Sequence, residues 1–481
     1  MANLLSSSFV KILTVCVYAG VAFPLVASEK LNTKPSILFI MVDDLGKEWI
    51  SCYGAEDIKT PNIDALAAGG MKFHNAYSMP ACTPSRTTLL TGKYPWRNGW
   101  TSHWDVPRWG VAYFDWKKKE NTTFARLMKD LGYATCAAGK WQINDFRIEP
   151  HAMKKHGFDD WAMWTGSETG NEASETRFHD AYVNTPEGSK TYAGKFGPDI
   201  YTDHLINFMR KHKEEPMCLY YPMTLVHRPW VTTPDEPKVR SRLERHKAMV
   251  RYTDKMVGKL IKTLDELKIR DRTIVIFTTD NGTTGGRVGF TATRNGNEVV
   301  GAKGEQSEAG VCAPFIVNCP GIVPEGVETD ALTDFSDMLP TFIELGGGQT
   351  PDDLVIDGVS IAPLILGKKK NSERKWIMSL GYGRARLTQK GVRGMTAFQK
   401  RVIRDKRYKV WVSTEKKIIR LHDLKKDPLE KINLFDSELV EHRKALKKFQ
   451  AVVDSLPDKD AHPFYEPRAE NSWDRKVEKA R

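Results

Sequence analysis

Two pairs of oxygen-bearing side chains stand directly after two long apolar runs of the sequence. Asp43 and Asp44 follow one run, and Asp280 and Asn281 follow the other. One such pair is commonly no more than a polar strand end, but two pairs at equivalent positions favour a shared metal site. Carboxylate and amide oxygens suit hard cations such as Ca²⁺ and Mg²⁺, whereas zinc prefers nitrogen and sulfur ligands. We therefore expect these four residues to hold one divalent cation.

A single cysteine introduces a segment with clear helix signals. Cys82 is followed by Thr83 and Pro84, which suit a helix cap and a first turn, and Gly92 ends the pattern. The sequence thus predicts that Cys82 stands just before a helix N-terminus, where N–H groups and the helix dipole attract anions. This position fits a reactive group for an anionic substrate, and it equally fits a buried structural cysteine.

Two further polar side chains follow weaker apolar runs. Lys140 comes after the run at 134–138, and His227 comes shortly after the run at 218–221. In an open α/β sheet, ligands bind in the crevice beyond the carboxyl ends of the strands. Lys140, His227 and the two acidic pairs would therefore converge on one crevice. That convergence is stronger evidence for a site than any one residue.

The runs that position these residues indicate a parallel sheet. The segments 36–42 and 273–279 are continuously apolar, which is typical of strands covered on both faces. Helical patterns alternate with the strands, at 60–69 and at 250–267. Alternating strands and helices predict a large, doubly wound, mainly parallel α/β domain, which we place at residues 29–370.

The character of the chain changes after about residue 370. Short alternating segments at 408–412 and 418–421 predict a small antiparallel sheet, and an amphipathic helix follows at 439–456. We therefore assign residues 371–481 to a smaller C-terminal α+β domain that carries this short antiparallel sheet.

The N-terminus has the layout of a cleaved signal peptide. Lys11 precedes an apolar run at 12–23, and small residues follow at 26–28. We expect residues 1–28 to be removed and the protein to be exported to a periplasmic, extracellular or lysosome-like compartment. Beyond this run no stretch is long and apolar enough to predict an integral membrane span. The other cysteines are scattered without a C-x-x-C pair, which indicates neither a zinc ribbon nor a disulfide framework.

The 481-residue chain is basic, with a formal net charge of +12, and many of its Lys and Arg residues lie in the last third. These residues include Lys368, Lys369, Lys370, Arg384, Arg386, Arg393, Lys400, Arg401, Arg404, Lys406 and Arg407. A basic balance favours an anionic partner, such as nucleic acid, an anionic membrane or an acidic substrate. Any single run of these residues is better explained as a solvated charged face.

The order of the polar motifs along the chain carries more information than any one of them. The segment that begins at Cys82 reads C-x-P-S-R and continues into T-G-x-x-P. The other motifs are Asp43-Asp44, Gly139-Lys140-Trp141, His227, Asp280-Asn281-Gly282, Gly301-x-Lys303 and a closing run from Leu421 to Leu434. Together, over nearly the whole mature chain, they resemble the type I, formylglycine-dependent sulfatases of the alkaline phosphatase superfamily.

The resemblance implies a modified cysteine and a particular metal. In this family a maturation enzyme converts the signature cysteine, here Cys82, to formylglycine. The resemblance also implies Ca²⁺, rather than Mg²⁺, as the cation. The implied ligands are Asp43, Asp44, Asp280, Asn281 and the oxygen derived from Cys82.

The resemblance also assigns catalytic roles. Arg86, Lys140 and Lys303 match positions that hold the sulfate or the formylglycine hydroxyl, and His227 matches the general acid to the leaving alcohol. One hydroxyl of the hydrated aldehyde would attack sulfur, and deprotonation of the other would release sulfate. The export signal and the basic balance favour a sulfated glycan as the substrate, so nucleic acid is not an expected partner.

This sequence departs from the family pattern at two places. The family usually reads G-K-W-H, but here Gln142 replaces the histidine, which is a candidate base for sulfate release. Glutamine exchanges hydrogen bonds but takes no proton at neutral pH. His227 is one substitute base if it resets after acting as the acid, and His74 or His103 is a speculative second. The segment 308–314 also departs from the family, although its role is less directly chemical.

Two alternatives follow from these departures and from the shared fold. The first is a phosphonate or phosphate ester hydrolase with the same nucleophile. The second is a catalytically weak glycan-binding relative, against which stands the intact signature of Cys82, Pro84 and Arg86. The sugar and the sulfate position depend on loops such as 100–116 and 164–195. Tryptophans in these loops suit sugar stacking and plain packing equally.

Overall fold

The computed structural model describes residues 34–102, 122–168, 170–383, 385–388, 391–463 and 472. The expected signal peptide at 1–28, His103, most of the loop 100–116, and Arg384 lie outside the described residues. The expectations for them, and the domain limits proposed above, stay predictions.

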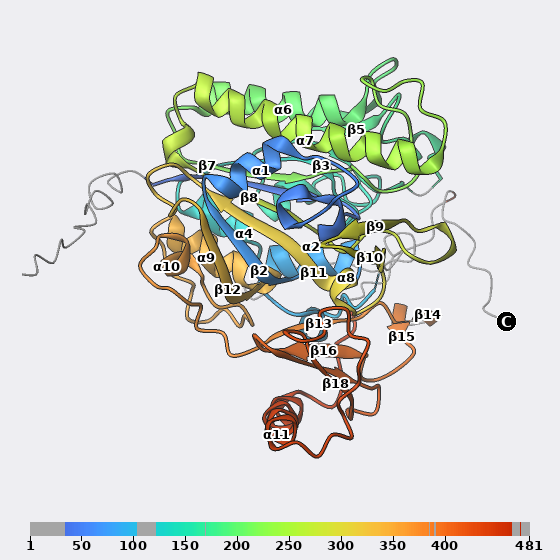
Figure 1. Cartoon of the computed structure of the whole chain (residues 1–481). Coiled ribbons are helices and arrows are strands. Elements are labelled where there is room, and N and C mark those ends of the chain that lie inside the picture. Colours follow the sequence, from blue (N-terminus) through green and yellow to red (C-terminus); the bar gives the residue numbers. More distant parts are fainter. Residues whose placement is uncertain are drawn as a thin grey trace, which may run out of the picture.

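Ten strands form one mixed sheet at the centre of the molecule (Figure 1). In chain order they are β1 (Ser36–Val42), β2 (Met71–Tyr77), β3 (Ala134–Lys140), β4 (Asp160–Trp164), β5 (Tyr182–Thr185), β6 (Gly188–Thr191), β7 (Met217–Pro222), β8 (Thr273–Thr279), β11 (Cys312–Asn318) and β12 (Val327–Asp334). Across the sheet the order is β12-β2-β11-β8-β1-β7-β3-β4-β5-β6. The block from β8 to β4 is parallel, whereas β11, β5 and β6 pair antiparallel with their neighbours. The prediction of a mainly parallel sheet is confirmed.

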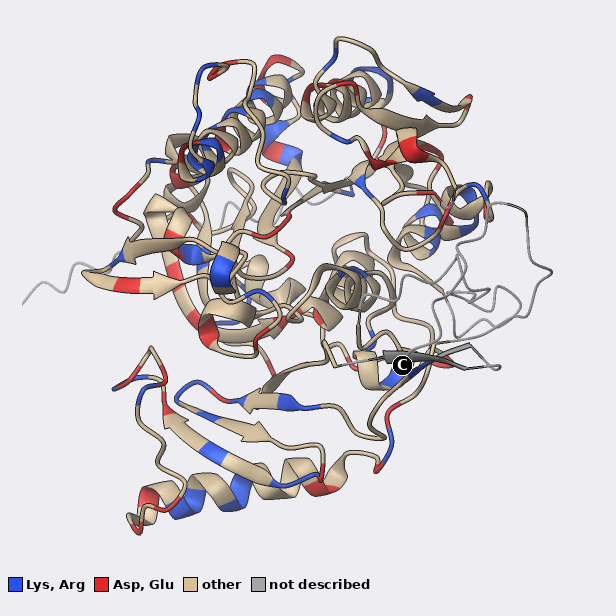
Figure 2. Cartoon of the chain, turned by 90° about the vertical axis from the view of Figure 1, so that its right-hand side faces the viewer, with Lys and Arg blue, Asp and Glu red and all other residues tan. Residues whose placement is uncertain are grey.

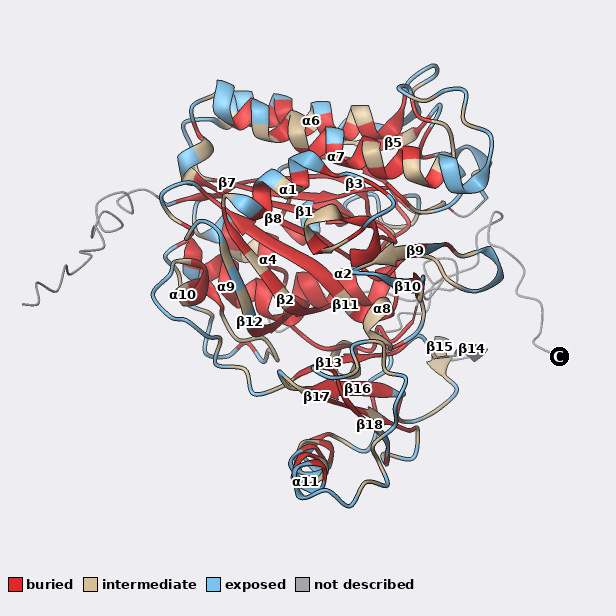
Figure 3. Cartoon of the chain, in the orientation of Figure 1, coloured by how far each residue is buried: buried red, intermediate tan, exposed pale blue. Residues whose placement is uncertain are grey.

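Helices cover both faces of this sheet (Figure 1). On one face lie α1 (Pro61–Ala68), α6 (Gly197–His212) and α7 (Arg242–Glu266), and on the other α2 (Cys82–Thr91), α4 (Phe124–Asp130) and α9 (Met338–Leu345). Alternate residues of β1 enter the two layers, because Phe39 packs against Phe342 of α9 while Ile40 shares a cluster with Leu260 of α7. Every residue of β1 is buried (Figure 3), which is why its sequence is continuously apolar.

Shorter elements connect these layers. The short helices include η2 (Lys47–Trp49), α3 (Pro95–Asn98), α5 (Ala152–His156), α8 (Glu308–Val311) and α10 (Ala362–Ile365), and β9 (Thr291–Arg294) and β10 (Asn297–Val300) form a hairpin. Both 36–42 and 273–279 are strands at the predicted bounds. β3 extends to Lys140, so this lysine is the last residue of its strand instead of following it.

A second, four-stranded antiparallel sheet follows in the C-terminal part, as predicted. Its strands are β13 (Ile377–Leu380), β16 (Arg401–Arg404), β17 (Tyr408–Val412) and β18 (Ile418–Asp423), and β14 (Ala385–Thr388) pairs separately with β15 (Gly391–Gly394). The amphipathic helix α11 (Val440–Ser455) buries Phe449 and Val453 against Val410 and Leu421 of this sheet. The helix predicted at 439–456 is therefore confirmed, and it covers one face of the small sheet.

Several basic residues of the last third are structural. Arg401 is fully buried in an ion pair with Asp460, and Arg404 is buried against Glu308. Lys and Arg residues are otherwise spread over the described chain, including α11 (Figure 2). The basic residues therefore do not gather on one continuous solvated face. Among the described residues, no helix has the length and apolarity that crossing a membrane requires.

Candidate active site

The two acidic pairs meet where β1 and β8 end. These strands are parallel neighbours in register, with Val42 beside Thr279, so the residues that follow them lie side by side. The backbone N–H of Asp44 donates to Asp280 Oδ1 at 3.1 Å, and Asn281 Nδ2 donates to Asp44 Oδ1 at 2.8 Å. All four predicted ligand residues are at most 2% exposed. The structure thus brings together the set that the sequence predicted.

The donor set suits a hard cation. Ligand atoms of Asp43, Cys82 and Asp280 all lie within 4.8 Å of one another. Asp43 Oδ1 and Asn281 Oδ1 are buried oxygens that have no hydrogen-bond partner, which is costly unless another group satisfies them. Burial and the neighbouring Asp43 raise the pKa of Asp280 to about 7. A divalent cation among these oxygens would satisfy the acceptors and favour the ionised carboxylates.

Three cations interlock with three carboxylates at this site. Lys140 Nζ lies 2.5 Å from Asp43 Oδ2, and Lys303 Nζ lies 2.6 Å from Asp44 Oδ1. Arg86 Nη2 lies 2.7 Å from Asp280 Oδ2, and its Nη1 donates to the Lys140 carbonyl. The six formal charges cancel. A bound divalent cation would therefore leave the cluster with a charge of about +2, which suits an anionic substrate.

The predicted helix cap is two residues late. α2 begins at Cys82 itself, and Ala81 is the N-cap, so the prediction that Thr83 caps the helix is wrong. Ser85 holds this first turn, because its hydroxyl donates to the Asp280 carbonyl at 2.5 Å and accepts from the Met79 N–H at 3.0 Å. Ser85 thus ties the first turn of α2 to the end of β8.

Gln142 lies against the candidate nucleophile. Cys82 Sγ donates to Gln142 Oε1 at 3.1 Å, and the backbone of Gln142 has a φ of 54° and donates to the Thr165 carbonyl. His74 is on β2 and contacts Glu328, so the structure does not bring it to Cys82 as a substitute base. The described residues thus leave Gln142 as a hydrogen-bonding group beside Cys82.

The side chain of His227 is oriented by an arginine that the sequence did not single out. His227 Nε2 lies 3.7 Å from Asp44 Oδ2, which faces the site. On the other side of the ring, Arg177 Nη2 lies 2.8 Å from Nδ1 and donates to the Arg228 carbonyl. Nδ1 also lies 2.6 Å from the Arg228 carbonyl. The ring hydrogen is on Nε2 when Nδ1 accepts from the guanidinium, which only donates, and on Nδ1 when the ring donates to that carbonyl. Burial and the nearby Lys303 lower the pKa of His227 to about 3, so the ring is neutral.

Arg177 is buried by an aromatic neighbour. Its guanidinium lies 4.3 Å from the centroid of the Trp164 ring, and the residue is 8% exposed. Both residues belong to the 164–195 segment that the sequence flagged as a substrate loop. The contact between Arg177 and Trp164 depends on how the segment folds and leaves no periodic pattern in the sequence. It can therefore be seen only in the structure.

Comparison with known proteins gives the same assignment over most of the chain. A family model described as sulfatase matches residues 35–348, and one described as N-sulphoglucosamine sulphohydrolase, C-terminal, matches residues 305–455. The N-acetylgalactosamine-6-sulfatase of Canis lupus familiaris is 31% identical over 358 residues, which cover 69% of this chain and 66% of that protein. The steryl-sulfatase of Rattus norvegicus is 28% identical and is covered to 72%, against 71% of this chain.

Several solved structures share this fold. The crystal structure of Ps i-CgsB superposes with a TM-score of 0.72 at 24% identity, covering 87% of this chain and 93% of that one. The Bacteroides thetaiotaomicron structure BT33336S-sulf, from work on glycosaminoglycan metabolism, has a TM-score of 0.65 at 26% identity and covers 88% and 99%. BT4656, solved with D-glucosamine-2-N,6-O-disulfate, has a TM-score of 0.67 at 21% identity and covers 89% and 99%.

Proposed function

This chain belongs to the sulfatase family of sulfuric ester hydrolases, and we propose that it removes sulfate esters from a sulfated carbohydrate in an exported compartment. The observation that carries the proposal is the buried cluster in which Cys82 stands beside three carboxylates and three cations. Such a cluster, with a divalent cation added, is electrostatically suited to a monoanionic sulfate ester.

We assign Ca²⁺ to Asp43, Asp44, Asp280 and Asn281, and formylglycine to position 82. The cation would polarise a sulfate oxygen and lower the pKa of a hydroxyl on the nucleophile, and the hydrated aldehyde would supply that hydroxyl. The Cys82 thiol, as encoded, then lies where the hydroxyls of the hydrated aldehyde would lie after maturation.

The remaining residues bind charge or move a proton. Arg86, Lys140 and Lys303 surround the carboxylates and are placed to hold sulfate oxygens as charge develops in the transition state. His227, with its hydrogen on Nε2, donates toward the leaving oxygen of the sugar. Gln142 orients the nucleophile through the contact that Cys82 now makes.

A second feature supports a carbohydrate substrate. A shallow pocket of about 370 Å³ is lined by Arg147, Glu168, Asn171 and Tyr182, a mixture of charged, amide and phenol groups that suits sugar hydroxyls. Gly166, two residues before Glu168 of this pocket, packs against Gln142, because an added Cβ there would lie 2.9 Å from Gln142 Cγ. The relatives named above include enzymes for sulfated sugars, and the same class of substrate fits this pocket.

The proposal is tested by assaying the matured protein on defined sulfated oligosaccharides, on an aryl sulfate and on an aryl phosphonate. We expect release of sulfate from at least one oligosaccharide at a kcat/KM well above that for the phosphonate. The Cys82→Ala variant is the matched control and should be inactive. Preferred turnover of the phosphonate would instead support the related ester hydrolase. A folded, matured protein that binds the oligosaccharides without releasing sulfate would support the glycan-binding alternative.

A further inference from the structure

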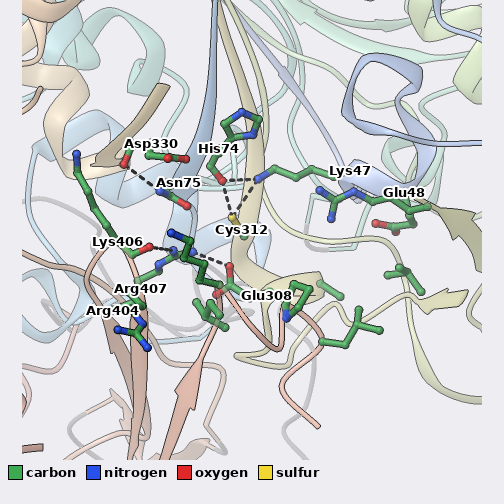
Figure 4. Close-up of a pocket in the computed structure, with 17 residues that line it drawn as sticks. Lys47, Glu48, His74, Asn75, Glu308, Cys312, Asp330, Arg404, Lys406 and Arg407 are labelled. Carbon is green, nitrogen blue, oxygen red and sulfur yellow. Dashed lines mark hydrogen bonds and ion pairs between the residues drawn. The ribbon is translucent and has the colours of Figure 1, made fainter. Parts of the chain in front are cut away.

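A second pocket lies away from the catalytic cluster, between the main sheet and the C-terminal sheet. Its volume is about 470 Å³, within the range of small-molecule sites. Figure 4 shows His74, Asn75 and Cys312 of the main sheet on one side and Arg404, Lys406 and Arg407 on the other. Lys47 and Glu48 of η2, Arg294 of the β9–β10 hairpin and Lys425 complete the lining used below.

Cationic groups dominate this pocket. Lys47, Arg294, Lys406 and Lys425 line it, and among the described residues none of them lies within 4.0 Å of a carboxylate oxygen. Lys406 and Lys425 are exposed, and the Lys406 ammonium donates to the Asn371 side chain, which carries no charge. These four cations therefore differ from most lysines and arginines of the small sheet, which are held in ion pairs.

Lys47 is the least expected of the four. It is 6% exposed, and its ammonium donates to the His74 carbonyl at 2.8 Å and to Cys312 Sγ at 3.0 Å. These contacts use two of its three N–H groups, and neither partner is an anion. A buried ammonium without a counter-charge is unfavourable unless an anion compensates it.

The acidic residues of the lining act on these cations from a distance, but among the described residues none of them forms an ion pair with Lys47 or Arg294. Glu308 is already paired, at 2.9 Å with Arg404 Nη1 and at 3.1 Å with Lys409 Nζ. Glu48 accepts from the Thr283 hydroxyl at 2.5 Å, and burial raises its pKa against the opposing effect of this hydrogen bond and of Arg294 and Lys47. Asp330 is exposed on β12, and its backbone carbonyl accepts from Asn75. The four cations are thus left to a ligand.

We propose that this pocket binds a sulfated sugar unit of the polymeric substrate, as a second site distinct from the catalytic centre. The proposal rests on the proposed function for the identity of the polymer. Lysine and arginine N–H groups make strong charge-assisted hydrogen bonds to sulfate oxygens, and the pocket is large enough for a sugar ring with its sulfate. The ligand is an anionic glycan and not a membrane surface, because the key cation, Lys47, lies inside a concave site.

The second site is continuous with the segments that carry the metal ligands. The Gly46 N–H donates to Thr283 Oγ1 at 2.8 Å, and Thr283 in turn bonds Glu48, so η2 is tied to the chain that follows Asp280 and Asn281. The wall that holds Lys47 thus begins three residues after Asp44. A long glycan held here would raise the local concentration of its other sulfates near the catalytic cluster.

Kinetics on long and short substrates tests the site. The Lys406→Glu/Lys425→Glu variant reverses two exposed cations of the pocket, and Lys211→Glu/Lys262→Glu makes the same charge change on α6 and α7. For a defined sulfated hexasaccharide we expect the pocket variant to raise KM about tenfold, with 4-nitrophenyl sulfate turnover unchanged and the control variant close to wild type on both. Equal effects of the two variants on the hexasaccharide would overturn the proposal.

Hydrogen exchange of the inactive Cys82→Ala protein separates this proposal from the proposed function. The sulfated hexasaccharide should protect peptides that contain residues 404–407 and 424–429, while its desulfated counterpart and inorganic sulfate at equal concentration should protect them less. Protection that survives the Lys406→Glu/Lys425→Glu change, or protection confined to peptides near Cys82, would contradict a second site. Absence of sulfate release by the wild-type protein, with the 404–429 protection intact, would count against the activity alone.

Discussion

Two buried ion clusters lie close together in this molecule and differ in one respect. In the catalytic cluster, Asp43 Oδ1 and Asn281 Oδ1 are buried without partners, although three cations surround the carboxylates. In the second cluster, Glu308 accepts from Tyr77, Arg404 and Lys409, and none of its oxygens is left without a partner.

The difference distinguishes a cluster that can bind a ligand from one that only holds the structure together. We call the structural cluster of Glu308, Arg404, Lys409 and Tyr77 the Glu308 clamp. The Glu308 cluster joins α8 to β16 and β17, so it fixes the small sheet on the large one. The catalytic cluster keeps acceptors that only an added group satisfies. Burial and charge alone are common to both clusters, and the unsatisfied oxygens are what predict a bound cation.

The largest expected effect is at Asp280. The Asp280→Ala variant removes a proposed cation ligand and the partner of Arg86, so we expect turnover to fall by ~10³-fold or more. Elemental analysis of the purified variant should find the divalent cation lost, whereas the wild type should hold Ca²⁺. A variant that keeps full activity without bound metal, or a wild type that holds zinc, would contradict the assignment.

The matched change in the second cluster is Glu308→Gln. Because Arg404 then stays buried without a counter-charge and Lys409 keeps only Glu430, 2.9 Å away, we expect a loss of about 3 kcal/mol in the free energy of unfolding. Turnover per folded molecule should stay near wild type. Denaturant unfolding with parallel assays measures both quantities, and a selective loss of activity would show that the clamp is catalytic after all.

This clamp also predicts a pH dependence of stability. Burial alone would raise the pKa of Glu308, but Lys409 and Arg404 lower it from the ordinary value of 4.5. The carboxylate therefore stabilises the fold fully above pH 4.5, and its contribution is lost as the pH falls below that value. Wild-type unfolding between pH 5 and pH 3, compared with Glu308→Gln, measures this contribution, which should vanish in the variant.

Arg177 tests the orientation of His227, the proposed general acid. In the Arg177→Met variant, Nδ1 of His227 is released to donate to the Arg228 carbonyl, 2.6 Å away, so Nε2 loses its hydrogen. We expect kcat to fall by ~10²-fold for alcohols that are poor leaving groups and far less for aryl sulfates. Arg177→Lys keeps a donor and should recover part of the rate. A loss that is equal for both kinds of leaving group would mean that Arg177 has only a packing role.

The smallest expected effect is at Gln142. Since glutamine takes no proton, we expect sulfate release to limit turnover and rapid mixing to show a burst of alcohol equal to the enzyme concentration. Gln142→His should shrink the burst and raise the steady rate by roughly tenfold at most, which is below the usual range for a dedicated base. A linear time course, together with a merely weaker variant, would show that the site works with glutamine as it stands.

The sequence predicted the parts of the fold that leave a local pattern. β1 and β8 are continuous apolar runs because both faces of the sheet are covered, and their polar ends converged as expected. The antiparallel strands β11, β5 and β6 were not predicted, since strand direction depends on partners far along the chain. For the same reason Arg177 and the Glu308 clamp were missed, and the cap at Thr83 was misplaced because Ser85 makes contacts with distant backbone groups.

The central claim is that the side chain encoded as Cys82 becomes the nucleophile of a sulfatase. Peptide mass spectrometry of position 82, carried out on the same preparations whose desulfation rate is measured, tests this claim most directly. The account predicts that the rate rises in proportion to the fraction of protein that carries an aldehyde at position 82. Full desulfation activity in a preparation whose Cys82 is an unmodified thiol would contradict it.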